Sequence, residues 1–142
     1  MKAVLLVSVL ALASSSGFLE LEPKANNVGA NCNTALNEYT VDTFDLSPWP
    51  PARQENVTLS MTGSFDVAES IDALVVNVDY NSVPFYQLVI PRSGKYNKGQ
   101  AYKDGYTAYF PNIAPSGNYA VSLQLRNSAN VYLNCWQVTF KL

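Results

Sequence analysis

The 142-residue chain contains no histidine. Histidine is the most common general base and the most common metal ligand in proteins, so its absence excludes Ser-His-Asp and Cys-His catalytic arrangements. No glycine-rich phosphate-binding loop follows a predicted strand. We therefore expect a protein that is not an enzyme and that uses no cofactor and no metal. A hydrolase acting on lipids or glycans is the least favoured of the functions considered.

Charge is also scarce, since charged residues make up 14% of the chain and the formal net charge is −2. A general nucleic-acid-binding protein would present a basic surface, so this class is excluded. Positive charge is concentrated between residues 91 and 104, which hold four basic residues against one aspartate.

No apolar run is long enough to span a bilayer. Near the N-terminus, Lys2 precedes an apolar run over residues 3–13 and a small-residue stretch that ends at Gly17. This pattern predicts a secretory signal peptide over residues 1–17, with a short membrane anchor or a buried first strand as the alternatives. Residues 18–30 then form a polar leader. The signal peptide predicts that the protein is secreted or lies in the lumen of the lysosome or of another endomembrane compartment.

Cysteine is limited to Cys32 and Cys135. In an exported chain an even pair predicts a disulfide, and two free buried thiols are the alternative. Because this bond closes a long loop, it would stabilise the fold by about 4–5 kcal/mol in the chain-entropy model.

A sustained helical period is absent, and apolar residues instead alternate with polar ones along much of the chain. Strands are expected at residues 39–46, 57–67, 74–80, 85–90, 105–110, 119–125 and 131–142. About seven strands with frequent turns predict an all-β fold, a two-sheet antiparallel β-sandwich of immunoglobulin-like shape. Residues 91–104 are expected to form a long polar loop, and the change of apolar phase at Cys135 and Trp136 predicts a β-bulge.

Two local motifs can each be interpreted as a functional site or as an ordinary surface feature. Asn56 begins an Asn-Val-Thr sequon, which predicts N-glycosylation unless the triplet arose by chance. Asp66, Glu69 and Asp72 cluster in one predicted turn. A solvated surface turn is favoured there over a calcium site, because the spacing is not that of an EF-hand.

Three segments carry a family resemblance: Asn56 to Phe65, Val78 to Pro84, and Phe110 to Tyr119, the last with Ile-Ala-Pro-Ser-Gly-Asn-Tyr before an alternating strand and a late Cys135. Their order and spacing resemble the ML-domain (lipid-recognition) family, which includes secreted phosphatidylglycerol/phosphatidylinositol transfer proteins and sterol carriers. The similarity predicts one ML-type domain over residues 31–142.

The resemblance implies that the two sheets stand apart and enclose an apolar cavity. Its expected lipid-binding side chains are Met61, Phe65, Val76, Val78, Phe85, Tyr106, Phe110, Leu123 and Phe140. The implied function is binding or transfer of a lipid by a monomer, with an acyl chain or sterol held between the sheets. Periodicity alone favours packing of the same residues into a dry core. The alternative function is therefore an extracellular module with a solid core that binds a receptor or a glycan.

The basic segment over residues 91–104 is the second functional candidate. Its lysines, arginine and tyrosines suit transient contact with an anionic membrane surface, although an ordinary solvated loop is equally favoured. The resemblance places this segment near the cavity mouth, so the expected headgroup and membrane rim comprises Arg92, Lys95, Tyr96, Lys98 and Tyr102. Many family members have a cysteine pair in this segment, and its absence here predicts a more mobile loop.

Overall fold

The computed structural model describes residues 27–142, so the predicted signal peptide and most of the predicted leader lie outside the described residues. Within them the chain forms eight strands and no helix able to cross a membrane. The strands are β1 (Ala30–Asn31), β2 (Tyr39–Ser47), β3 (Glu55–Phe65), β4 (Glu69–Tyr80), β5 (Val83–Tyr96), β6 (Ala101–Phe110), β7 (Asn118–Asn127) and β8 (Trp136–Lys141).

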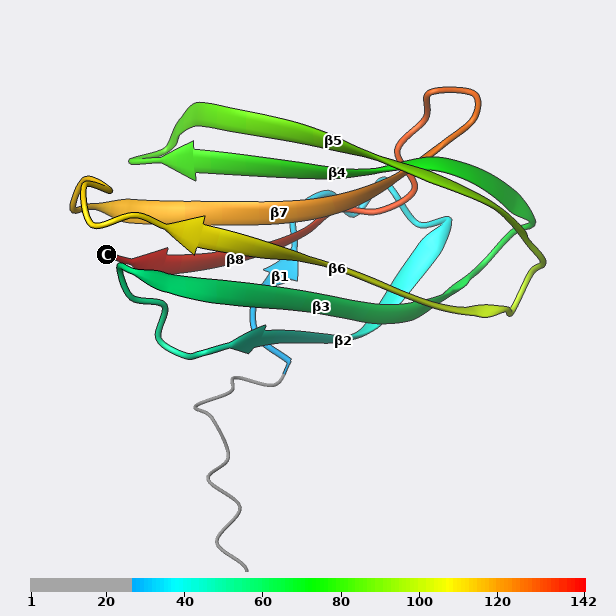
Figure 1. Cartoon of the computed structure of the whole chain (residues 1–142). Helices are drawn as coiled ribbons and strands as arrows, with labels where there is room; N and C mark the ends of the chain where they lie inside the picture. The colour runs from blue at the N-terminus through cyan, green and yellow to red at the C-terminus, as the bar shows by residue number, and fades with distance from the viewer. Residues whose placement is uncertain (1–26) are drawn as a thin grey trace, which may run out of the picture.

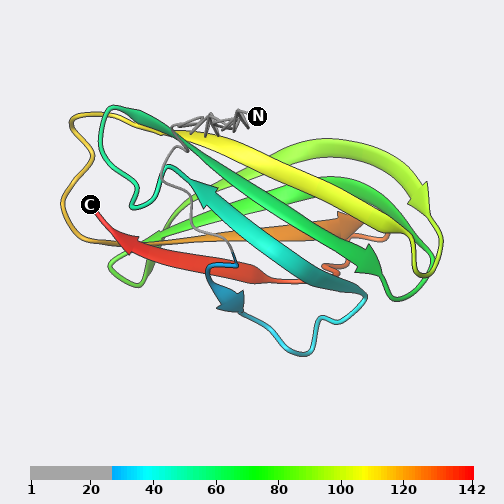
Figure 2. The ribbon, with the colours of Figure 1, turned by 90° about the horizontal axis from the view of Figure 1, so that it is seen from below.

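The strands form two antiparallel sheets that face each other as two layers (Figure 1). One sheet has five strands in the order β1-β8-β7-β4-β5, and the other has three in the order β2-β3-β6. Figure 2 shows the same layers from below, with the C-terminus at one end of the sandwich. The predicted all-β, two-sheet antiparallel sandwich is confirmed.

Alternation of apolar residues builds the core between the layers. Val57, Leu59 and Met61 on β3 are at most 2% exposed, while the residues between them are more exposed. They pack in one cluster with inward side chains of β4 and β7, including Val76 and Leu123. Each such side chain contributes roughly 1.5–3 kcal/mol by leaving water, which explains why the alternating segments form strands at these positions.

The prediction of a long polar loop over residues 91–104 is wrong. Strand β5 continues to Tyr96 and β6 begins at Ala101, so only a tight turn separates them. Gly99 adopts a φ of 81° in this turn, a left-handed conformation that favours glycine. Its N–H donates to the carbonyl of Phe65, which attaches the turn to the end of β3.

The predicted β-bulge lies just before β8, which begins at Trp136. Tyr132 pairs with Arg126 and Trp136 pairs with Leu123, so this segment has one residue more than the part of β7 beside it. There the Leu133 N–H donates to the Leu125 carbonyl, and the Asn134 side chain accepts a bond from the Leu125 N–H. The extra residue produces the change of apolar phase. Further register shifts occur in β2, in β4 and where β4 meets the start of β5.

The predicted disulfide between Cys32 and Cys135 is confirmed, with 103 positions between the two residues. The bond closes one edge of the sandwich, where β1 pairs with the start of β8. Beside it, the Trp136 ring stacks on Phe44 of the other sheet, and its indole N–H donates to the Val28 carbonyl. This edge is therefore joined covalently and by packing.

Candidate functional site

An apolar pocket lies at the end of the sandwich that holds the β4–β5 hairpin and the β6–β7 loop. It has a volume of about 320 Å³, at the lower end of the range for small-molecule sites. Its lining comprises Val78, Phe85, Tyr86, Tyr106, Ala108, Tyr109, Phe110, Pro111, Ile113, Ala114, Pro115, Tyr119 and Val121. The lining comes from both sheets, since β6 lies in one and β4, β5 and β7 lie in the other.

Hydrogen bonds hold the two loops around this pocket together. The Asn81 N–H donates to the Asn118 carbonyl, and the Asn118 N–H donates back to the Asn81 side chain. The Tyr80 hydroxyl donates to the Ser116 carbonyl at 2.9 Å. On the other side, the Arg53 guanidinium donates to the Ala114 carbonyl and the Ser116 hydroxyl. The mouth of the pocket is therefore preorganised.

Large apolar side chains are exposed around the mouth. Ile113 is 87% exposed, Phe85 is 66% exposed and Val83 is 63% exposed. Tyr86 and Tyr109 are more than half exposed and carry hydroxyl groups at the same end. A cluster of exposed apolar side chains of this kind is typical of a surface that contacts an apolar partner or ligand.

Aromatic rings form the inner wall of the pocket. Phe110 contacts Tyr119 and Phe140 edge-on, and Tyr119 stacks on Phe140 with ring centroids 5.9 Å apart. The Tyr119 hydroxyl donates to the Pro115 carbonyl, and burial raises the pKa of this phenol. The wall therefore connects the β6–β7 loop to the packed core.

At the opposite end of the sandwich, aromatic packing closes the space between the sheets. Phe65 stacks on Tyr96 at 4.7 Å, and Tyr96 contacts Tyr102 at 4.8 Å. Gly94 is needed here, since a Cβ at this position would lie 2.7 Å from the Tyr96 ring. The Tyr39 hydroxyl adds a hydrogen bond to the Tyr102 carbonyl.

Between the two ends, Arg92 of β5 and Asp104 of β6 form an ion pair that joins the sheets. The guanidinium reaches the carboxylate through Nε and Nη2, with a shortest distance of 2.9 Å. Asp104 is nearly buried and also accepts a bond from the Tyr102 hydroxyl at 2.7 Å. The bond to Asp104 raises the pKa of Arg92, and burial followed by the same carboxylate raises the pKa of Tyr102. We call these three residues the inter-sheet clasp.

The structure separates the predicted lipid-binding residues into two groups. Those lining the pocket are Val78, Phe85, Tyr106 and Phe110. Those lying in the packed core are Met61, Phe65, Val76, Leu123 and Phe140. The second group is at most 9% exposed, so these side chains contact one another and the remaining core.

The predicted rim residues are not placed around this pocket. Arg92 and Tyr102 belong to the clasp, and Tyr96 belongs to the aromatic cluster beside it. Lys95 and Lys98 are exposed near the β5–β6 turn, at the far end of these strands from the pocket. The guanidinium of Arg92, a residue expected at the headgroup and membrane rim, pairs with Asp104 at the edge of the sandwich.

Sequence reasoning missed Ala108, Tyr109, Ile113 and Arg53 at the pocket mouth. The sequence did offer a signal for Ile113, because it is a large apolar residue in a predicted turn, between Pro111 and Pro115. The position of Arg53 depends on how the β2–β3 and β6–β7 loops meet, which the local pattern does not contain. Ala108 and Tyr109 lie on β6, where Ala108 alternates with Tyr106 and Phe110.

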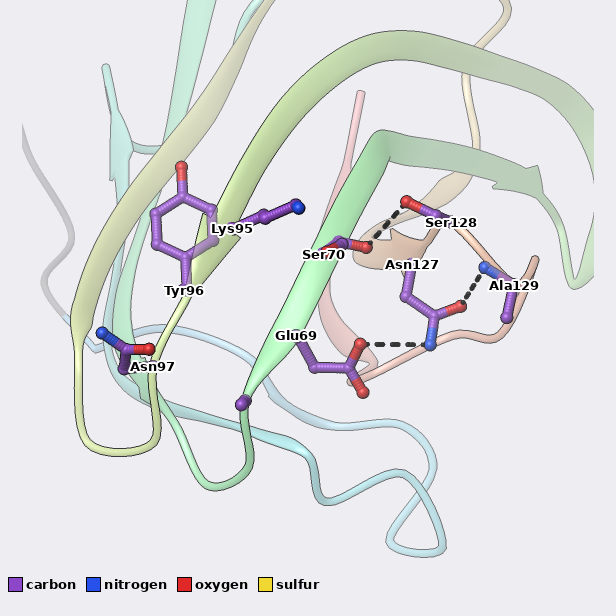
Figure 3. A pocket seen from close by; sticks show the side chains of 9 residues that line it. Glu69, Ser70, Lys95, Tyr96, Asn97, Asn127, Ser128 and Ala129 are labelled. Atoms are coloured by element: carbon purple, nitrogen blue, oxygen red, sulfur yellow. Dashed lines mark hydrogen bonds between the residues drawn. The ribbon is translucent and has the colours of Figure 1, made fainter.

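A second hollow, lined mostly by polar residues, lies beside Lys95 and Tyr96 (Figure 3). Its polar groups bond to each other: Asn127 donates to Glu69, and Ser128 donates to the Ser70 carbonyl. Asp72 pairs with Arg126, and Asp66 accepts a bond from Thr40, so the three carboxylates considered for calcium have different partners. Within residues 27–142, no group of three His, Cys, Asp or Glu side chains is placed to hold a metal.

The sequon residue Asn56 is exposed on β3 and points away from the core, beside a polar hollow on the outer face of the three-stranded sheet. Its partner across the sheet is Tyr109. An attached glycan would therefore lie outside the sandwich, on the face opposite the core.

Comparison with known proteins adds independent information. A family model described as the ML domain matches residues 27–142. Two proteins of Dictyostelium discoideum, provisionally named phosphatidylglycerol/phosphatidylinositol transfer proteins, are 25% and 23% identical to the chain. The alignments cover 86% and 82% of this chain and 91% and 84% of those proteins.

Solved structures show the same fold. A Niemann-Pick type C2 protein from the Japanese carpenter ant superposes with a TM-score of 0.62 at 17% identity, covering 80% of this chain and 98% of that one. The sporulation control protein Spo0M of Bacillus subtilis gives a TM-score of 0.52 at 12% identity, covering 75% of this chain and 48% of that one. At these identities the likeness concerns the fold. Because the family model matches all of the described residues, the chain belongs to the ML-domain family.

Proposed function

We propose that this protein binds a lipid and transfers it between apolar environments, with the lipid tail held in the pocket between β5 and β6. The observation that carries the proposal is an apolar pocket between the sheets whose mouth is surrounded by exposed apolar side chains. The provisional names of the two Dictyostelium relatives support the same class of ligand. An acyl chain or a sterol suits the pocket chemistry, and a secreted or lumenal location suits the disulfide.

The mechanism requires no covalent step. Transfer of apolar lipid surface from water into the pocket contributes about 25 cal/mol per Å². The polar headgroup stays at the mouth, beside the exposed Tyr86 side chain and the β6–β7 loop, whose Ala114 carbonyl accepts a bond from Arg53. Exposed Ile113 and Phe85 would contact the membrane from which the lipid enters. The lysines near the β5–β6 turn remain candidates for contact with anionic membranes, but they lie too far along the strands to hold a headgroup at this mouth.

Filling the pocket tests the proposal. Ala108 lines the pocket from β6, and Thr107 beside it faces the outer surface. We expect Ala108→Phe to reduce uptake of a fluorescent fatty acid and a fluorescent phosphatidylglycerol at least tenfold. Thr107→Phe adds the same ring to the opposite face of the same strand, and it should leave uptake unchanged. Urea denaturation of both variants verifies that they fold.

Lipid extraction and mass spectrometry of the purified protein give a second measurement. Recovery of a stoichiometric lipid from the wild type, and its loss in Ala108→Phe, is the expected result. If the wild type yields no lipid and takes up neither probe, lipid carriage is rejected. The interaction module with a solid core is then favoured, because much of the space between the sheets is already packed.

A further inference from the structure

The apolar pocket is small for a lipid with two tails. Its volume of about 320 Å³ corresponds to roughly ten methylene groups, since a methylene takes up about as much space as a water molecule does in the liquid, about 30 Å³. The two tails of a common membrane phospholipid contain several times as many methylenes. The pocket therefore has room for one tail, or for part of a long one, and no room for a second.

Packed side chains close the pocket on its inner side. Val78 on β4 and Val121 on β7 line it, while the next inward residues of these strands, Val76 and Leu123, are fully buried and do not. Val76 and Leu123 lie opposite each other in the register of the two strands and belong to the core cluster. Because a packed core contains few voids larger than a water molecule, a tail cannot continue past the two valines without displacing core side chains.

An aromatic wall limits the width of the pocket between the sheets. Phe110 belongs to the three-stranded sheet, whereas Tyr119 and Phe140 belong to the five-stranded sheet. The Phe110 ring contacts both of them edge-on, with centroids 5.9 Å from Tyr119 and 5.6 Å from Phe140. These rings already meet across the gap, so the pocket can widen on this side only if the wall separates.

The connections at the mouth limit widening in the other direction. The β4–β5 turn and the β6–β7 loop lie at the same end of the sandwich (Figure 1). Two hydrogen bonds join Asn81 to Asn118, and a third joins the Tyr80 hydroxyl to the Ser116 carbonyl. Moving these connections apart to admit a second tail would break the bonds, and each broken bond lowers stability.

The pocket lining contains no charged side chain. Arg53, which lies beside the β6–β7 loop, donates to the Ala114 carbonyl and the Ser116 hydroxyl. Burial of the tail is therefore the main source of affinity, and the number of tails that fit decides which lipids bind well.

We propose that the pocket holds one acyl chain at a time, so that single-chain lipids, such as lysophospholipids and fatty acids, are the ligands whose apolar part it buries. This inference rests on the proposed function and narrows its class of ligand. A phospholipid with two tails would insert one of them and leave the other at the mouth, over the exposed side chains of Phe85 and Ile113. The second tail would then add little to the affinity.

A comparison of two lipids that differ only in the second tail tests the inference. Competition with a fluorescent fatty acid gives dissociation constants for octanoyl-lysophosphatidylcholine and dioctanoylphosphatidylcholine, both kept below their critical micelle concentrations so that only monomers compete. A fully buried second tail would raise the affinity roughly a thousandfold or more, at about fourfold per methylene. For the wild type we expect the lipid with two tails to bind at most about tenfold more tightly, through contacts at the mouth.

Enlarging the pocket should reverse this result. Phe110→Ala removes a ring from the pocket wall, and the preference for the lipid with two tails should then rise at least about tenfold above that of the wild type. Phe44→Ala is the matched control, because it removes the same ring from a fully buried position that stacks on Trp136 and does not line the pocket. The control should keep the wild-type preference. Urea denaturation verifies that both variants fold, and Phe110→Leu replaces Phe110→Ala if the latter does not, with a rise in the same direction required.

The outcomes separate this inference from the proposed function. A wild-type preference for the second tail above tenfold would overturn the inference and leave lipid binding intact. The same holds if octanoyl-lysophosphatidylcholine fails to displace bound fatty acid, if the Phe110 variant keeps the wild-type preference, or if Phe44→Ala raises it equally. If the wild type binds neither the fatty acid nor either phosphatidylcholine, the proposed function itself fails.

Discussion

The two ends of the sandwich use aromatic residues in opposite ways. At the end formed by the β3–β4 and β5–β6 turns, Phe65, Tyr96 and Tyr102 pack face to face or edge to face, and the hollow beside Tyr96 is lined mostly by polar residues. At the other end, Phe85, Tyr86 and Tyr109 are more than half exposed around an apolar pocket. The connections differ in the same way: a short turn over residues 97–100 joins β5 to β6 at the closed end, whereas at the open end the two strands lead into separate connections.

A single type of substitution made at each end provides the strongest test of this contrast. Phe65→Ala removes a ring that is 1% exposed and should lower the free energy of unfolding by about 3–5 kcal/mol. Phe85→Ala removes a ring that is 66% exposed and should change it by less than about 1 kcal/mol. Urea denaturation measures both. Equal losses would show that the open end is packed as tightly as the closed end.

Removal of one member of the clasp should have the next largest effect. Asp104→Ala leaves the Arg92 guanidinium without its carboxylate, and we expect a loss of about 2–3 kcal/mol in the free energy of unfolding. This value is below that for a fully buried pair, because Arg92 still reaches water. Asp72→Ala on the outer face should cost much less, since its side chain is 39% exposed. Chemical denaturation of both variants at neutral pH makes the comparison, and similar losses would contradict a special role for the clasp.

The closed end should also be sensitive to alkaline pH. Burial is the main cause that raises the pKa of Tyr102, so its phenol stays protonated longer in the folded chain than in the unfolded chain. Above the ordinary tyrosine pKa of about 10, the folded state therefore binds more protons than the unfolded state. The contribution of Tyr102 to the free energy of unfolding is complete below this pH and decreases as the pH rises further. At neutral pH, Tyr102→Phe should be about 1 kcal/mol less stable than the wild type, because the bond to Asp104 is missing. Between neutral and alkaline pH, the free energy of unfolding of the variant should fall less than that of the wild type.

Urea midpoints of wild type and variant, measured at neutral pH and above the ordinary tyrosine pKa, give this pH dependence. Burial also raises the pKa of Tyr39, which remains in the variant. Part of the wild-type dependence of stability on pH should therefore persist in the variant. A variant whose pH dependence matches the wild type in full would show that Tyr102 is not the titrating group.

The smallest effect on stability is expected at the mouth of the open end. Ile113→Ser changes a side chain that is 87% exposed and should leave the free energy of unfolding within about 0.5 kcal/mol of the wild type. Association with neutral phosphatidylcholine vesicles should nevertheless weaken roughly tenfold, because isoleucine contributes on that order when it enters an apolar phase. Val131→Ser, at an exposed position on the β7–β8 connection, is the control and should bind vesicles as the wild type does. Unchanged vesicle binding by Ile113→Ser would place the membrane contact elsewhere.

Clear alternation allowed much of the fold to be predicted. Strands β3, β4 and β7 carry an apolar residue at nearly every inward position, so their sequence pattern contains both the strand and its buried face. The second half of β5 and the first half of β6 were missed for a physical reason. Their inward positions hold Arg92, Gly94, Tyr96, Tyr102 and Asp104, which satisfy each other across the sheets and so lack the apolar signal of a strand.

The candidate site was predictable only in part. Val78, Phe85, Tyr106 and Phe110 were expected to line a cavity and do line the pocket. Met61 and Leu123 carry the same inward pattern, yet they lie where the sheets are packed. Periodicity identifies the face on which a side chain lies, and it contains no information about the distance to the facing sheet at that point.

By itself, the sequence determined the sandwich, its disulfide and its membership of a lipid-recognition family, because alternation, cysteine pairing and motif order are all local or countable features. Only the tertiary structure decided which end is open and which is closed. The closed end is held by contacts across the two sheets, such as Phe65 with Tyr96 and Arg92 with Asp104. The strands in each of these pairs share no backbone hydrogen bonds, so the linear pattern does not encode the partnership.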